Sequence, residues 1–196
     1  MPEVVVVGRQ YTTPSQVGLK MVKKTMTGAN GNTMFQVISK SWTLRSRRFL
    51  VDAVNNHIVS FEKKLTSMHS TRRVYRGDSE DPGDLLFTVT RTSLFQTKIQ
   101  LDVFLASNTS QVNPDFKVKG ARFEQSCTIY AGNSATVIAQ MDHKGTVTVY
   151  PHVDRAFIFA LIVILQEIDE ECTPTNQRKV DLNAPDFGSF LNGLMN

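Results

Sequence analysis

Apolar and polar residues alternate with a period of two through most of the chain before position 150. In one such segment Ile99, Leu101 and Val103 share one face, while the residues between them are polar. This alternation is typical of β-strands that have one face on a core and the other in water. Two of these segments are separated by Asn55-Asn56, a pair that tolerates the positive φ angles of a tight hairpin. The pattern predicts about twelve strands in this part of the chain.

The period changes near the C-terminus, where ten apolar residues follow one another from Ala156 to Leu165. As a helix they would rise about 15 Å, roughly half the thickness of the hydrocarbon core of a bilayer. Charged residues lie close on both sides of the run, and charges enter lipid at high cost. A helix that is apolar on every face and does not cross a membrane must be surrounded by protein. The run therefore predicts a buried central helix.

The ends of this helix also have sequence signals. Asp154 is a suitable N-cap, and Pro174 is a suitable stop. Glu167, Asp169, Glu170 and Glu171 near its C-terminal end oppose the helix dipole, so we expect these acids to lie in solvent.

A sheet of many strands can bury a helix that is apolar on every face if the sheet closes around the helix. An eight-stranded barrel is filled by its own side chains, but about twelve strands leave room for a helix. The sequence thus predicts a mainly β fold, a closed antiparallel β-barrel around a central hydrophobic C-terminal α-helix. We expect three parts: an N-terminal extension (1–16), the barrel (17–171) with the helix at about 154–169, and a C-terminal tail (172–196).

Composition and the cysteines indicate a cytoplasmic protein. The N-terminus has only a short apolar stretch, so we expect no secretory signal, and no other run is long enough for a transmembrane span. Cys127 and Cys172 are the only cysteines, which suits a reducing compartment better than a disulfide scaffold.

The net charge of +4 is unevenly distributed. Residues 1–98 hold 15 Lys and Arg against 7 Asp and Glu, and residues 99–196 hold 7 against 11. Arg can bind a phosphate through two parallel hydrogen bonds, which Lys cannot. A face of five cations near an anionic leaflet would contribute roughly 5 kcal/mol of binding free energy. The candidate anionic lipid-binding residues are Arg45, Arg47, Arg48, Lys63, Lys64, Arg72 and Arg73. The alternative is that these clusters are only a solubilising surface.

No arrangement of residues indicates catalysis. The four histidines lack metal-ligand spacing, so we expect no metal site and no cofactor. The segment from Gly28 to Thr33 resembles a phosphate loop but is better explained by a hairpin turn at Asn30-Gly31. Cys127 lies on the inward face of its strand, which favours an inert core residue. The chain has no motif for direct reading of nucleic acid, and its one confident helix is buried.

The sequence resembles the plant LURP-one-related proteins, which share the tubby-like fold with tubby C-terminal domains and phospholipid scramblases. The resemblance covers most of the chain from Val17 to Glu171. It is carried by FEKKLTSMHSTRRVYRG from Phe61, LLFTVTRTSLFQTKIQLDVFLASN from Leu85, DFKVKGARFEQSCTIYAG from Asp115, VIAQM from Val137 and VTVYPHVDRAFIFALIVIL from Val147.

The resemblance implies a twelve-stranded barrel threaded by a hydrophobic C-terminal helix. This chain departs from it in two short spacings, at 24–30 and at 144–147, where family members have additional strand-like stretches. Either two strands or loops are missing, or the chain as given omits segments. A real deletion would leave sheet edges unpaired.

A shared fold does not transfer a function. The resemblance implies a link to plant defence, because the founding member is linked to defence against an oomycete, and tubby relatives bind phosphoinositide headgroups as membrane-tethered transcriptional regulators. Our leading hypothesis is a monomeric, non-enzymatic module that docks on phosphoinositide or other anionic membranes, at the plasma membrane or in the nucleus. The alternative is a scaffold that binds an unknown signalling protein through exposed sheet edges, the acidic loop at 78–84 or the tail. An enzyme, lipid scrambling included, ranks last.

Overall fold

Strands make up most of the fold, and one long helix follows them. The computed structural model describes residues 3–40, 47–64, 70–94, 97–121 and 125–172. Its helix is α1 (Arg155–Cys172), and two short 3-10 helices are η1 (Arg9–Tyr11) and η2 (Pro82–Asp84). The strands are β1 (Val17–Val22), β2 (Thr25–Thr27), β3 (Thr33–Lys40), β4 (Arg47–Asp52), β5 (His57–Lys64), β6 (Thr71–Arg76), β7 (Leu85–Leu94), β8 (Lys98–Leu105), β9 (Phe116–Ala121), β10 (Ser126–Ala131), β11 (Val137–Met141) and β12 (Thr146–Val149).

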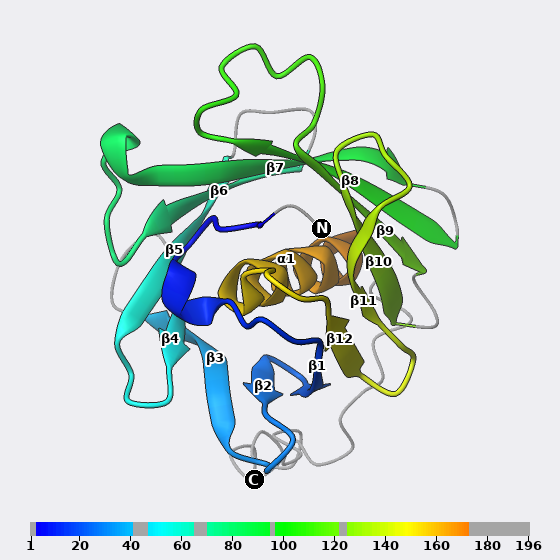
Figure 1. Ribbon diagram of the computed structural model, residues 1–196. Coiled ribbons are helices and arrows are strands. Elements are labelled where there is room, and N and C mark those ends of the chain that lie inside the picture. The colour runs from blue at the N-terminus through cyan, green and yellow to red at the C-terminus, as the bar shows by residue number, and fades with distance from the viewer. Residues whose placement is uncertain (1–2, 41–46, 65–69, 95–96, 122–124, 173–196) are drawn as a thin grey trace, which may run out of the picture.

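The strands form one closed antiparallel barrel. Each strand pairs with the strands before and after it in sequence, and β1 pairs with β12 to close the sheet. Figure 1 shows the ring of strands with α1 passing through its middle. The predicted mainly β barrel with a central C-terminal helix is confirmed, and so is the number of strands.

The strands beside the two short spacings are short, but the sheet is closed. β2 has three residues and β12 has four, and both pair with β1 through registers such as Met21↔Met26 and Leu19↔Val147. Because β1 is held on both sides, the described strands leave no sheet edge unpaired. The unpaired edges expected from a deletion are therefore absent from the part of the chain that the structure describes.

The helix fills the barrel, as its apolar sequence predicts. Every residue from Ala156 to Leu165 is buried. The Phe157 ring packs edge-on against Phe87 and Phe116, with ring centroids 5.1 and 4.9 Å away. Burial of one such large side chain stabilises the fold by about 1.5–3 kcal/mol. Within the described residues, no helix has the length and apolar character needed to cross a membrane.

Asp154 caps the helix, as predicted, and also holds the N-terminal segment. Its Oδ1 accepts hydrogen bonds from the backbone N–H groups of Ala156 and Phe157, at 3.0 and 3.1 Å. Its Oδ2 accepts from Val7 and Gly8 at 2.7 and 3.0 Å. Residues before position 17 therefore contact the helix start directly. The division into 1–16, 17–171 and 172–196 stays a prediction, and the proposed stop at Pro174 lies outside the described residues.

Both predicted hairpin turns form. Asn55 has a φ of 65° between β4 and β5, and Gly31 has a φ of 78° between β2 and β3. The N–H of Gly31 donates to the carbonyl of Gly28 at 3.0 Å, which closes the second turn. This segment is thus a hairpin, and the phosphate-loop interpretation does not apply to it.

Candidate functional site

The helix leaves the barrel at the end where β1 turns into β2, and we call this the helix-exit end. Strand direction places at this end the ends of the odd-numbered strands and the starts of the even-numbered strands. Several of the cations predicted from sequence meet the acids of the last helical turns here. Four of the seven ion pairs between described residues lie here, and we take this end as the candidate site.

Glu171 is the centre of the first ion-pair cluster. Its Oε1 lies 2.9 Å from Lys63 Nζ and 2.7 Å from Arg72 Nη2. The hydroxyl of Ser70 donates to its Oε2 at 3.4 Å. Partial burial acts to raise the pKa of Glu171, but hydrogen bonds from Lys63 and Arg72 outweigh it and hold the pKa below its usual value. At neutral pH the carboxylate is therefore ionised and neutralises part of the basic cluster.

Glu167 forms a second cluster and corrects one expectation. We expected the acids near the helix end to lie in solvent, but the side chain of Glu167 is only 5% exposed. Its Oε1 lies 3.6 Å from Lys24 Nζ and pairs with the guanidinium of Arg48. Glu167 lies about one turn before the helix leaves the barrel, so it still faces the barrel wall, where two cations offset the cost of its burial. Glu170 and Glu171 are exposed, as expected, and Asp169 is partly exposed.

The alternation of strands separates the predicted cations into two groups. Arg48, Lys63 and Arg72 point toward the helix, on the same faces as the core residues of their strands. Arg72 is only 2% exposed, so it cannot contact a membrane directly. It acts instead as an internal partner of Glu171.

The other group lies on the outer wall. Arg47 donates to the carbonyls of Asp78 and Ser79 at 2.6 and 3.2 Å, pairs with Glu80 at 2.9 Å and covers the Phe49 ring. These contacts hold the acidic 78–84 loop against the barrel.

Arg73 and Lys64 are also on the outer wall. Arg73 lies 3.8 Å from Glu62, which also accepts a hydrogen bond from the Tyr75 hydroxyl. Burial raises the pKa of Tyr75, and the nearby Glu62 adds to this. Lys64 is exposed and has no ion-pair partner among the described residues. Arg45 lies outside the described residues.

Charge is polarised along the barrel axis. The cations at the helix-exit end are Lys20, Lys23, Lys24, Arg47, Arg48, Lys63, Lys64, Arg72, Arg91, Lys98 and Lys144. The acids of the loops at the opposite end are Asp52, Asp78, Glu80, Asp81, Asp84 and Asp115, against the cations Arg9 and Arg76. The acids of α1, and Asp142 in the β11–β12 turn, offset part of the basic end. An anionic surface would therefore meet the helix-exit end first.

The described residues hold no group of three or more metal-ligating side chains that could bind a metal ion. Cys127 is buried, which raises the pKa of its thiol to about 12, and a protonated buried thiol is a poor nucleophile. The inert core interpretation of Cys127 is consistent with both observations.

Sequence reasoning missed the partners of the basic residues. Lys24, Glu167 and Glu171 were not among the candidates, although they complete both clusters. The signal was present in the alternation, because Arg48 shares a face with Leu50, and Arg72 shares one with Val74. Those positions predict inward side chains next to the helix.

Comparisons with known proteins agree with the fold. A protein-family profile described as LURP-one-related matches residues 15–166. The Arabidopsis thaliana protein LURP-one-related 15 is 40% identical over 188 residues, covering 85% of this chain and 87% of that protein. Protein LURP1 from the same plant is 40% identical over 187 residues, covering 85% and 90%. A crystal structure of an Arabidopsis thaliana protein superposes with a TM-score of 0.71 at 39% identity, covering 84% of this chain and 98% of that one.

Proposed function

Because the chain belongs to the LURP-one-related family, we propose that it is a non-enzymatic module that docks reversibly on anionic membranes through the helix-exit end of its barrel. The observation that supports this proposal is the charge polarity of the barrel. Phosphoinositide headgroups are the preferred ligand class, since they carry several phosphates on one small ring. The proposal places the protein as a monomer in the cytoplasm, at the plasma membrane or in the nucleus, in plant defence signalling.

The number of free cations sets the strength of docking. Ion pairs within the protein already occupy much of the basic cluster, so the charges do not act as five free cations. Among the described residues, the exposed lysines at this end without an ion-pair partner are Lys20, Lys23, Lys64, Lys98 and Lys144. The ammonium of Lys20 donates to the carbonyl of Lys144, which leaves the other four for a ligand. At about 1 kcal/mol for each lysine near an anionic leaflet, they supply roughly 4 kcal/mol. This energy supports reversible docking and not permanent anchoring.

Vesicle co-sedimentation tests the proposal. The purified protein is mixed with neutral vesicles, with vesicles containing phosphatidylinositol bisphosphate, and with vesicles matched for charge by phosphatidylserine. We expect binding to the bisphosphate vesicles to exceed binding to the charge-matched ones at physiological salt. Equal binding to both, disappearing at physiological salt, would reduce the basic end to a solubilising surface.

Charge-reversal variants locate the surface. Lys64→Glu and Lys23→Glu each change the net charge by two units at the helix-exit end, and each should weaken binding roughly tenfold or more, at about 1 kcal/mol per charge. Arg9→Glu makes the same change at the opposite end, where Arg9 is 80% exposed and pairs only with Glu3 among the described residues. This control should bind like the wild type. An equal loss in all three variants would contradict a defined docking face.

The internal ion pairs favour one alternative, a scaffold that binds a signalling protein without contacting lipid. The closed barrel offers no free edge among its described strands, and the 78–84 loop is held by Arg47, so the partner would bind the outer wall. Raising the salt concentration distinguishes the two functions. Lipid docking should weaken steeply with ionic strength, whereas a mainly apolar protein interface should not.

A further inference from the structure

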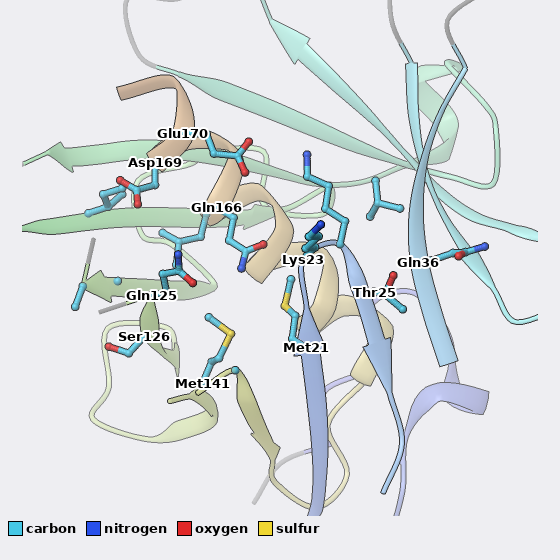
Figure 2. A pocket seen from close by; sticks show the side chains of 17 residues that line it. Met21, Lys23, Thr25, Gln36, Gln125, Ser126, Met141, Gln166, Asp169 and Glu170 are labelled. Carbon is cyan, nitrogen blue, oxygen red and sulfur yellow. The ribbon is translucent and has the colours of Figure 1, made fainter. Parts of the chain in front are cut away.

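A pocket of about 680 Å³ lies inside the helix-exit end, between the last turns of α1 and the barrel wall. Figure 2 shows it bounded by α1 on one side and by β1 and β2 on the other. Its size is in the range of pockets that bind small molecules, about 300–1,000 Å³. The short β2 and the early turn at Lys23 leave this space beside the helix unfilled.

The inner wall of the pocket is apolar and flexible. Met21, Ile99, Met141 and Leu165 line it, and each is less than 10% exposed. Gly120 also lines it, and because Gly120 has no Cβ, Leu165 can lie against β9. Methionine side chains are unbranched and adapt to irregular shapes. The described lining contains no aromatic ring to stack on a flat ligand, so the wall suits a flexible aliphatic chain.

The mouth of the pocket is polar and carries both signs of charge. Gln125 and Gln166 offer amide groups there. Lys23 lies on the β1–β2 side, while Asp169 and Glu170 project from the helix on the other side (Figure 2). A headgroup with one negative and one positive charge would find a partner of opposite sign on each side.

We propose that this pocket binds a single-chain amphiphile with a zwitterionic headgroup. The aliphatic chain lies against Met21, Met141 and Leu165, the anionic part of the headgroup faces Lys23, and the cationic part faces Asp169 and Glu170. The site shares Lys23 with the proposed docking surface, but its apolar wall lies inside the barrel rim. Its test needs no vesicles, and either proposal can fail alone.

Methyl NMR of the full chain with isotope-labelled methionines tests the proposal, with dodecylphosphocholine below its micelle concentration as the probe. We expect the Met21 and Met141 methyl signals to shift saturably. Met34 lies on β3 outside the pocket lining and should not shift. Dodecanoate and dodecylammonium, which each lack one charge, should bind about threefold more weakly, the size of one exposed ion pair. No saturable shift, or equal shifts at Met21, Met34 and Met141, would overturn the proposal.

Two tryptophan variants show whether binding occurs in the pocket. Gln166→Trp places a large ring in the pocket and should weaken binding at least tenfold, with the thermal midpoint little changed. Gln100→Trp makes the same change on the outer face of β8, outside the pocket lining, and should bind like the wild type. Wild-type affinity in Gln166→Trp would refute this site. If Gln166→Trp failed to fold, the shifts of the wild-type methionines would still decide the question.

Discussion

Replacing Asp154 should destabilise the protein more than replacing any other charged residue of the fold. Its carboxylate is fully buried and accepts backbone hydrogen bonds from two separate parts of the chain. Asp154→Ala would leave the N–H groups of Ala156 and Phe157 without their cap. It would also leave those of Val7 and Gly8 without an acceptor.

The contacts give the size of the effect. Loss of a helix N-cap costs about 1 kcal/mol. Each hydrogen bond from Val7 and Gly8 has a charged acceptor, and such bonds contribute about 1.5–3 kcal/mol. Together these give roughly 4–7 kcal/mol, against about 5–15 kcal/mol for the stability of a typical domain. Asp154→Asn keeps one acceptor oxygen, so it should lose about half as much.

Urea unfolding measures the prediction. With a slope of about 2 kcal/mol per molar urea, Asp154→Asn should lower the midpoint by at least about 1 M, and Asp154→Ala should lower it by about 2–3.5 M. Asp142→Ala is the matched control, because Asp142 also accepts two backbone N–H groups but in an exposed turn. It should shift the midpoint much less. A loss below about 1 kcal/mol in Asp154→Ala would refute the claim that one carboxylate holds both segments.

Three further results are expected. Glu171→Gln should lower the free energy of unfolding by less than about 1 kcal/mol, since the Glu171 side chain is 33% exposed. Because the pKa of Glu171 is lowered in the folded protein, this difference from wild type should shrink as the pH falls below about 4.5, which urea titrations at several pH values would measure. Burial raises the pKa of the Cys127 thiol to about 12, so Cys127 should resist alkylation in the native protein and react in urea, as measured by mass spectrometry. Rapid labelling of the native protein would contradict its burial. Gly120→Val puts a Cβ 2.9 Å from Leu165 Cδ2 and should lower the free energy of unfolding by about 1–3 kcal/mol. In a double-mutant cycle, adding Leu165→Ala should restore part of that loss.

The fold was predictable because its signals are local. Alternation marks each strand, the apolar run marks the helix, and Asp154 marks the helix start. The barrel follows because nothing else in the chain can cover a helix that is apolar on every face. The second role of Asp154 could not be predicted, because it depends on Val7 lying beside a residue 147 positions away in sequence.

The candidate site was predictable only in part. The clustering of arginines in sequence is visible, but each pair of neighbours divides between the two faces of its strand. Arg72 therefore points inward to Glu171, and Arg73 points outward to Glu62. Which cation meets which acid depends on how far the helix extends along the barrel, and composition does not give this. The pocket was not predicted, since it results from strand lengths and not from a motif.

The position of the helix in the chain has a consequence for synthesis. All twelve strands leave the ribosome before α1, which is the core that their inner faces need. The first and last strands pair with each other, so the sheet also cannot close until translation has nearly reached the helix. Until then the apolar inner faces of the nascent strands stay uncovered, a state that favours aggregation or chaperone binding. A ribosome-bound chain that stops before residue 150 should bind chaperones, and one that extends past α1 should be released.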